Sequence, residues 1–274
     1  MYSIVILTLN EEANLPKCLA SIAACDDIVV LDSGSTDRTA AIARDAGARV
    51  FTNPFRDFAQ QRNHAHTDIP FRHAWVLHLD ADECLTPQLH AECAAFAASA
   101  AAETSDGCYI APKMIFRGRW IPHCTDFPAY QARFVHVQRF RFVQAGHGQR
   151  EAPGLRMAHL RHSYLHDLSA QPESEMIAKH ARYARAEAAA FMRNRRPVTT
   201  LLGELAGRET LRRRRALKEL SQHLPFRGPL RLIYQYCLRG GFLDGRAGWA
   251  YCRILARYEA DVQREIRRLR ATTP

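Results

Sequence analysis

Residues 3–51 read SIVILTLNEEANLPKCLASIAACDDIVVLDSGSTDRTAAIARDAGARVF and alternate three short apolar runs with two helical patterns. The apolar runs at residues 3–9, 27–32 and 48–51 are typical of buried parallel strands. The second helical pattern ends at Gly47, a residue type that commonly terminates helices. Strands that alternate with helices predict an α/β fold with a doubly wound, mostly parallel sheet.

The alternation continues for one more unit and then changes. A helix is expected at residues 57–66 and a fourth buried strand at residues 74–79. After residue 82 the sequence predicts a mixture of helices and period-2 strands, namely a helix at 87–102, strands at 107–116 and 130–137, and an amphipathic helix at 173–193. The α/β alternation is therefore confined to the first third of the chain.

Polar side chains gather where the predicted strands end. Thr8, Asn10, Asp32, Asp80 and Asp82 all fall at the ends of apolar runs. Ligands of doubly wound sheets bind at the carboxyl ends of the strands. These residues therefore predict a binding site at one edge of the sheet.

The sequence Asp80-Ala81-Asp82-Glu83 has two interpretations. Two carboxylates separated by one residue, just past a strand, can share a ribose and a divalent metal, because hard cations prefer oxygen ligands. Alternatively, the carboxylates form a solvated acidic turn. Their position after the fourth strand favours the functional interpretation.

The sequence Asp32-Ser33-Gly34-Ser35-Thr36-Asp37 follows the second strand. Asp32 at the strand end can accept a base N–H, and Gly34 allows the backbone to turn tightly beside a ligand. Thr36 is expected to cap the next helix. Arg62, on the helix at residues 57–66, either faces the nucleotide or is an exposed helix charge.

These motifs resemble, in order and spacing, the family 2 glycosyltransferases, which have the Rossmann-like GT-A fold. The resemblance covers about the first third of the chain and also includes residues 7–12 and 61–63. It implies that a sugar nucleotide is held by Thr8, Asn10, Glu11, Asp32, Arg62 and Asp80. It implies that Asp82 binds Mg²⁺ or Mn²⁺ through the diphosphate. Ser33 departs from the family pattern, in which many members have an acidic residue there, and this puts individual nucleotide contacts in doubt.

The middle third is similar to a narrower group, the lipopolysaccharide core β-glucosyltransferases, at residues 130–134, 146–151 and 164–166. This resemblance implies that Glu151 is the base that deprotonates the acceptor hydroxyl; the alternative is a salt bridge to Arg150 or Arg133. His147 either positions the acceptor beside Glu151 or is an ordinary core or surface histidine. His166 is either a further metal or diphosphate ligand or a hydrogen-bonded residue at a strand end.

The eight cysteines are scattered without C-x-x-C spacing, which argues against a zinc site and a disulfide scaffold. Residues 1–7 run into a strand pattern without a basic n-region or cleavage site, so we expect no secretory signal and a reducing cytoplasm. No stretch approaches the roughly 20 apolar residues that span a bilayer.

The positive charge of the chain lies in its C-terminal part. Residues 193–274 contain 19 basic and 7 acidic residues, a net charge of +12, whereas residues 1–192 have 19 basic and 21 acidic residues. With Pro197 as the boundary, we expect a catalytic domain at residues 1–196 and a basic helical region at 197–274, with helices at 201–223, 230–238 and 247–269. The arginines at 212–215 either attach to an anionic membrane or form a solvated face packed on the catalytic domain.

The sequence thus predicts an inverting, metal-dependent transferase that moves a hexose, with glucose from UDP-glucose as the expected donor. The expected acceptor is a lipid-linked saccharide of the lipopolysaccharide core or another cell-envelope glycan, at the cytoplasmic face of the inner membrane. A protein, peptide or other glycolipid glycosyltransferase with the same donor site is the alternative within the class. A nucleotidyltransferase, or a nucleic-acid-binding module built on the basic tail, represents a different class. No nucleic acid is expected, because the basic helices lack interleaved aromatic residues.

Overall fold

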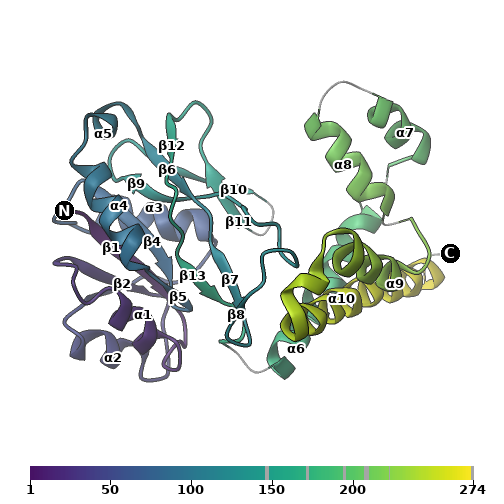
Figure 1. Cartoon of the computed structure of the whole chain (residues 1–274), viewed down its shortest axis with the longest axis horizontal. Coiled ribbons are helices and arrows are strands. Elements are labelled where there is room, and N and C mark those ends of the chain that lie inside the picture. The colour runs from purple at the N-terminus through teal and green to yellow at the C-terminus, as the bar shows by residue number, and fades with distance from the viewer. Residues whose placement is uncertain (146–147, 171–172, 194–195, 207–209, 222, 273–274) are drawn as a thin grey trace. The chain divides into compact units, whose positions relative to one another are not determined.

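The structure is a computed structural model that describes residues 1–145, 148–170, 173–193, 196–206, 210–221 and 223–272 (Figure 1). The chain divides into two compact units. The first contains Met1–Gly118 and Asp126–Ala170, and the second contains Arg119–Thr125 and Gln171–Pro274. This division differs from the boundary expected at residue 197, because helix α6 (Glu173–Arg193) packs against the last helix of the chain.

The first unit is built on a seven-stranded sheet with the order β12-β6-β9-β4-β1-β2-β3. The four predicted strands form its parallel half: β1 (Ser3–Thr8), β2 (Ile28–Asp32), β3 (Arg49–Thr52) and β4 (Trp75–Asp80). Strand β9 (Gln131–His136) runs antiparallel between β4 and β6 (Gly107–Ile110), and β12 (Met157–His159) pairs parallel with β6. The predicted α/β class and mostly parallel sheet are confirmed.

Helices cover both faces of this sheet, because both faces of the central strands are apolar. Ile4 and Ile6 of β1 point into a core shared with α1 (Leu15–Ser21), α2 (Thr39–Asp45), α4 (Pro87–Ala97) and α5 (Ala100–Thr104). Val5 points the other way, into a core with Ala65 of α3 (Phe58–Asp68). The alternation along β1 thus fixes the layers around the site.

Three local predictions need correction. The helix expected at residues 87–102 is two helices, α4 and α5, and the strand expected at 107–116 is β6 followed by β7 (Lys113–Phe116). Thr36 does not cap α2, which begins at Thr39. The backbone N–H of Thr39 donates to the Asp37 carboxylate instead, and that of Thr36 donates to Asn10.

Shorter strands complete the first unit. Strand β13 (Leu165–Asp167) pairs antiparallel with β5 (Glu83–Cys84) and parallel with β7. Strands β10 (Phe142–Ala145) and β11 (Gly148–Glu151) form a separate antiparallel pair. The pairing of β5 with β13 brings the segment after β4 beside residues more than 80 positions later in the chain. The strand pattern of the sequence did not reveal this pairing.

The topology of the sheet determines where a ligand binds. From β1 the chain proceeds outward to β2 and β3, and then returns to β4 on the other side of β1. The connections that leave β1 and β4 therefore diverge, and a crevice at the carboxyl ends of such strands is the usual ligand site of open α/β sheets.

The second unit is helical apart from β8 (Arg119–Trp120). It consists of α6, α7 (Val198–Ala206), α8 (Thr210–Ser221), α9 (Arg227–Leu232), the π-helix η1 (Ile233–Leu238), the 3₁₀ helix η2 (Gly241–Asp244) and α10 (Gly245–Thr272). Ala188 and Phe191 of α6 share a core with Val262 and Ile266 of α10. Within the described ranges, no helix combines the length and apolar character needed to cross a bilayer.

Two tight contacts organise the second unit. A Cβ at Gly228 would lie 2.9 Å from the carbonyl oxygen of Ala256, so the absence of a side chain there allows α9 to approach α10 closely. The buried Asp244 carboxylate accepts hydrogen bonds from the backbone N–H groups of His123 and Cys124, which ties residues 119–125 to the start of α10. All eight cysteines are free.

Candidate active site

The carboxyl ends of β1 and β2 are joined by side-chain hydrogen bonds. The Thr8 hydroxyl donates to Asp32 Oδ1 (2.9 Å), and both residues are buried. The N–H groups of Gly34 and Ser35 donate to Asp32 Oδ2, and the Ser35 hydroxyl donates to Oδ1. A carboxylate offers about four lone-pair positions, so Asp32 is fully engaged in shaping the turn after β2.

The loop after β1 is connected to the loop after β2. Asn10 has a φ of 56°, its N–H donates to the Ser35 hydroxyl, and its Oδ1 accepts from the Thr36 N–H. The N–H of Glu11 donates to the Thr39 hydroxyl, and its Oε2 accepts from Asn14 Nδ2. The polar groups of Asn10 and Glu11 thus hold the two loops together.

Asp80, at the end of β4, lies between two buried arginines. Arg62 Nη2 donates to its Oδ1 (2.8 Å) and Arg133 Nη2 donates to its Oδ2 (3.0 Å). Arg62 and Arg133 are only 1% and 4% exposed, which excludes the interpretation of Arg62 as an exposed helix charge. Arg133 also donates to Glu83 Oε1 (2.9 Å), and Glu83 Oε2 accepts from the N–H of Asp80.

The four charges of this network shift one another's ionisation. Although burial opposes charge, Arg133 and Arg62 hold the pKa of Asp80 well below its usual range. Burial raises the pKa of Glu83 to about 7, against the opposing effect of Arg133. Burial also disfavours the charged form of Arg133, but Asp80 and Glu83 keep its pKa well above the ordinary value. Asp80 is thus a carboxylate locked in its charged form.

Asp82 faces His166 across the β5–β13 pairing. His166 Nε2 lies 3.4 Å from Asp82 Oδ2, and His166 Nδ1 lies 3.5 Å from Glu83 Oε1. Burial lowers the pKa of His166, but the hydrogen bond to Asp82 and the charge of Glu83 outweigh it, so the net shift is upward. The structure therefore brings together the two residues predicted as metal ligands.

The side chains present can supply part of a metal site. Among the residues that the structure describes, no group of three or more His, Cys, Asp or Glu side chains is arranged to hold a metal ion. The Asp82 carboxylate is the kind of oxygen ligand that Mg²⁺ takes together with substrate phosphates. The His166 imidazole beside it is a nitrogen ligand, which suits transition metals better than Mg²⁺. The donor set thus fits a metal that arrives with a diphosphate.

Glu151, the predicted base, lies at the end of β11 and contacts Tyr109. The Tyr109 hydroxyl donates to Glu151 Oε1 (2.7 Å). Burial and this carboxylate raise the pKa of Tyr109 to about 12. Among the described residues, Glu151 forms no ion pair with Arg150 or Arg133, and Arg133 is engaged by Asp80 and Glu83. His147 lies outside the described residues.

Several residues of the site were not identified as such in the sequence. Glu83 and Arg133 complete the Asp80 network, and Tyr164 lies over the Arg133 guanidinium at 5.4 Å from the ring centroid. Tyr109 holds Glu151. Two signals in the sequence could have revealed these residues. Glu83 adjoins Asp82, and Arg133 is a charged residue within a buried strand, where a charge requires a partner.

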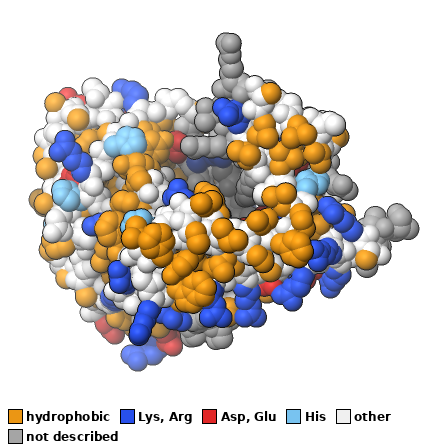
Figure 2. All heavy atoms as spheres, turned by 45° about the vertical axis from the view of Figure 1, so that its right-hand side comes forward, with side chains coloured by type: hydrophobic (Ala, Val, Ile, Leu, Met, Phe, Trp, Pro, Cys, Tyr) orange, Lys and Arg blue, Asp and Glu red, His pale blue; other side chains and the backbone are white. Residues whose placement is uncertain are grey.

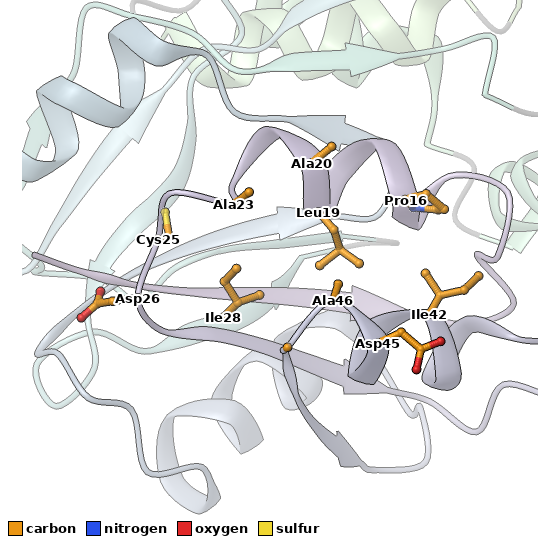
Figure 3. Close-up of a pocket in the computed structure, with 11 residues that line it drawn as sticks. Pro16, Leu19, Ala20, Ala23, Cys25, Asp26, Ile28, Ile42, Asp45 and Ala46 are labelled. Atoms are coloured by element: carbon orange, nitrogen blue, oxygen red, sulfur yellow. The ribbon is translucent and has the colours of Figure 1, made fainter.

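A separate hollow of about 600 Å³ lies between α1 and α2 (Figure 3). Its walls are mainly apolar, with Leu19 of α1 and Ile42 of α2 pointing toward each other. None of the predicted site residues lines it. We therefore place the candidate active site at the carboxyl edge of the sheet, where the charged groups converge.

The model of glycosyl transferase family 2 matches residues 3–151, so the chain belongs to this family. It is 42% identical over 92 residues to the lipopolysaccharide core biosynthesis glycosyltransferase LpsC of Rhizobium meliloti, which covers 32% of this chain and 33% of that protein. It is 36% identical over 91 residues to an uncharacterized glycosyltransferase of Rickettsia bellii, covering 33% and 30%. The matches thus span about a third of these relatives' length.

Two solved structures overlap with the fold. Glucosyl-3-phosphoglycerate synthase from Mycobacterium tuberculosis, in complex with Mn²⁺, UDP-glucose and phosphoglyceric acid, is 26% identical, with a TM-score of 0.34 and coverage of 43% of this chain and 44% of that chain. S. aureus TarS is 16% identical, with a TM-score of 0.42 and coverage of 92% and 54%.

Proposed function

We propose that this chain is an inverting hexosyltransferase that transfers glucose from UDP-glucose to a saccharide of the cell envelope, such as the lipopolysaccharide core. The observation that carries the proposal is the network of Asp80 with Arg62 and Arg133 beside the Asp82–His166 pair, at the switch point of a family 2 domain. A charged carboxylate next to a two-ligand metal position suits a nucleotide diphosphate.

The donor nucleotide is assigned to the loops after β1, β2 and β4. Thr8, Asn10, Glu11 and Asp32 hold the loops after β1 and β2 in place, and Arg62 fixes the Asp80 carboxylate. Because all acceptor positions of Asp32 are occupied, this residue contacts the base only if the Ser35 hydroxyl turns away from it. Asp32 and Asn10 therefore act mainly by holding the loops in position.

Asp82 and His166 are the residues that would hold Mg²⁺ or Mn²⁺ together with the diphosphate oxygens. When bound, the metal neutralises the charge that develops on the departing diphosphate. Asp82 and Glu83 raise the pKa of His166 despite its burial and so favour the protonated imidazole, whereas a metal would be held by the neutral form. Glu83 and Arg133 orient the segment that carries Asp82.

Glu151 is the proposed base. In an inverting transfer a carboxylate takes the proton of the acceptor hydroxyl as that oxygen attacks the anomeric carbon, and the nucleoside diphosphate departs from the opposite face. The hydrogen bond from Tyr109 leaves the second carboxylate oxygen of Glu151 for the acceptor. His147, which shortly precedes Glu151 in the sequence, is proposed to position the acceptor.

The acceptor is proposed to be lipid-linked and to be met at the cytoplasmic face of the inner membrane. The support is the +12 net charge of residues 193–274, which the first 192 residues do not share. Each basic residue near an anionic bilayer contributes on the order of 1 kcal/mol. Within this region, the sequence points to the arginines at residues 212–215 as the contact with the membrane.

A donor screen tests the proposal. The chain is incubated with Mn²⁺ and each common sugar nucleotide, and release of free nucleoside diphosphate is recorded. Slow hydrolysis of UDP-glucose, abolished by EDTA, is the expected result. Release of pyrophosphate would identify a nucleotidyltransferase instead, and faster hydrolysis of another sugar nucleotide would correct the donor.

A further inference from the structure

The second unit carries a row of apolar side chains on its surface. Along α9 and η1, the exposed fractions are 45% for Leu230, 55% for Ile233, 45% for Tyr234 and 76% for Leu238. Leu230, Tyr234 and Leu238 follow one another at intervals of four residues, and Ile233 adjoins Tyr234, so the four side chains lie toward one side of the helical segment. A stripe of this kind normally packs into a core, but this one faces solvent.

An aromatic cluster of the same unit connects η1 with η2 and α10. The Tyr236 ring of η1 lies 5.0 Å from the Trp249 ring of α10 and 6.3 Å from the Phe242 ring of η2. Phe242 and Trp249 are 53% and 42% exposed. In Figure 2, where the right-hand side of Figure 1 comes forward, hydrophobic side chains gather with Lys and Arg side chains beside them. We call the whole set the apolar surface: Leu230, Ile233, Tyr234, Leu238, Phe242, Leu243 and Trp249.

The exposed charge around the apolar surface is positive. Residues 223–257 contain six arginines and a single acidic residue, Asp244, which is 2% exposed. Arg246, Arg253 and Arg257 are exposed and stand on the same stripe of α10 as Trp249, at intervals of three or four residues. An anionic surface can therefore contact these arginines without being repelled by an exposed carboxylate of residues 223–257.

A hollow of about 300 Å³ adjoins the apolar surface. It is lined by Leu230 and Tyr234 together with Arg227, Arg231 and Glu259. Glu259 pairs with Arg227. Within the described ranges Arg231 forms no ion pair, and its guanidinium lies 5.9 Å from the Tyr234 ring centroid. A cation flanked by apolar walls matches a phosphate group that is attached to hydrocarbon.

We infer that the apolar surface docks on an anionic phospholipid bilayer, with its side chains in the headgroup region and the arginines on lipid phosphates. Aliphatic and aromatic side chains on one face with arginines beside them are typical of helices that lie in the membrane interface. The inference deepens the proposed membrane attachment, but it assigns the contact to α9, η1, η2 and α10 and not to residues 212–215.

A second copy of the chain fits this surface less well. A two-fold interface brings each residue of a surface against the same surface of its partner. Arg246, Arg253 and Arg257 would then meet their own counterparts, and like charges opposed across an interface are unfavourable. A bilayer supplies both the hydrocarbon that the apolar side chains require and the phosphates that the arginines require.

Vesicle flotation with the full chain tests the inference. Vesicles of phosphatidylcholine alone are compared with vesicles containing phosphatidylglycerol, at low and high salt. We expect binding to the anionic vesicles, weakening as salt rises. The double variant Ile233→Ser with Trp249→Ser should weaken binding by roughly tenfold or more. The matched control, Val198→Ser with Leu202→Ser, removes exposed apolar residues of α7 and should bind like the wild type.

The charged part of the surface is tested separately. Replacing Arg246 and Arg253 by Gln should weaken binding roughly tenfold to thirtyfold, whereas Arg267→Gln with Arg270→Gln, at the other end of α10, should weaken it less. Absence of wild-type binding to anionic vesicles at low salt would overturn the inference. The inference would also be overturned if both surface variants bind vesicles fully while replacement of the four arginines at residues 212–215 by Gln abolishes binding. The membrane contact would then lie on α8.

Donor hydrolysis in the absence of vesicles separates this inference from the proposed enzymatic function. Surface variants that hydrolyse UDP-glucose normally but fail to bind vesicles support the docking surface. A wild-type chain that hydrolyses no sugar nucleotide yet binds vesicles contradicts the proposed function alone. If gel filtration shows a wild-type dimer that Ile233→Ser with Trp249→Ser converts to a monomer, the surface is a self-interface and the inference is wrong.

Discussion

The carboxyl edge of the sheet and the surface of residues 223–257 both depend on arginine, but in opposite ways. At the sheet edge Arg62 and Arg133 are buried and paired with Asp80 and Glu83. In residues 223–257 most of the arginines are exposed, and the carboxylate of Asp244 is the buried group. Arginines paired inside the protein hold a site in a fixed shape, whereas Arg246, Arg253 and Arg257 are exposed and can meet an external anion.

The largest effect is expected at Asp82. Asp82→Ala should reduce transfer by roughly 10³-fold or more, because the leaving diphosphate loses its counter-ion and several kcal/mol of stabilisation. Steady-state transfer assays measure this loss, with Asp26→Ala, an exposed carboxylate far along the sheet, as the control. Near-normal transfer by Asp82→Ala would exclude the metal-dependent mechanism.

Glu151→Gln should lower turnover by roughly 10²–10⁴-fold while leaving UDP affinity nearly unchanged. The amide keeps the shape of the side chain and its contact with Tyr109, but it cannot take a proton. Single-turnover kinetics and UDP titration measure the two quantities. A collapse of both together would make Glu151 a structural or nucleotide-binding residue.

The contrast between buried and exposed arginine can be tested by stability. Arg133→Met leaves Asp80 and Glu83 without their shared partner and should cost about 3–5 kcal/mol of unfolding free energy. Arg253→Met, on the exposed stripe of α10, should change it by no more than about 0.5 kcal/mol. Urea unfolding measures the free energy of unfolding of both variants. Equal losses in the two variants would contradict the distinction between buried and exposed arginines.

A buried histidine pair beneath the site predicts a pH effect. His66 Nε2 lies 2.8 Å from His78 Nε2, and burial lowers the pKa of His66 to about 4 from its ordinary value of 6.5. Between pH 6.5 and 4, His66 of the unfolded chain therefore binds a proton, whereas His66 of the folded chain stays neutral. The stability from neutral His66 is full above pH 6.5 and is lost as the pH falls toward 4, by roughly 3 kcal/mol.

Comparison with His66→Phe removes the titration of His66 together with its contact to His78, whereas the titrating groups outside this pair are common to both proteins. The unfolding free energy of the wild type should fall relative to the variant as the pH is lowered from 6.5 to 4. A constant difference across this range would show that His66 is not held in its neutral form.

The sequence predicted the parts of the fold that depend on local pattern. The four parallel strands and α3 lie within two residues of their expected bounds, and Asp57 caps α3 through the N–H of Gln60. Period and capping residues are local signals, so they can be recognised without the tertiary structure. The split of α4 from α5 and the true start of α2 accompany hydrogen bonds of Ser99 with the Phe96 carbonyl and of Thr39 with Asp37, which the helix period does not reveal, and these predictions were wrong.

The candidate site shows the same division. Asp80 and Asp82 could be predicted because they follow a recognisable strand. The pairing of Arg133 with Asp80 joins residues 53 positions apart, and that of His166 with Asp82 joins residues 84 positions apart. No local pattern encodes such distances. The apolar surface was not identified in the sequence because Ile233 and Trp249 resemble ordinary core residues until their exposure is known.

The most direct test of the central claim is calorimetric titration of the wild-type chain with UDP, in Mn²⁺ and in EDTA, without membranes. With the diphosphate beside Asp82 and His166, UDP should bind in Mn²⁺ and lose roughly tenfold or more of its affinity in EDTA. Equal affinity in both buffers, or no binding in either, would contradict a metal-assisted nucleotide site at the carboxyl edge of the sheet.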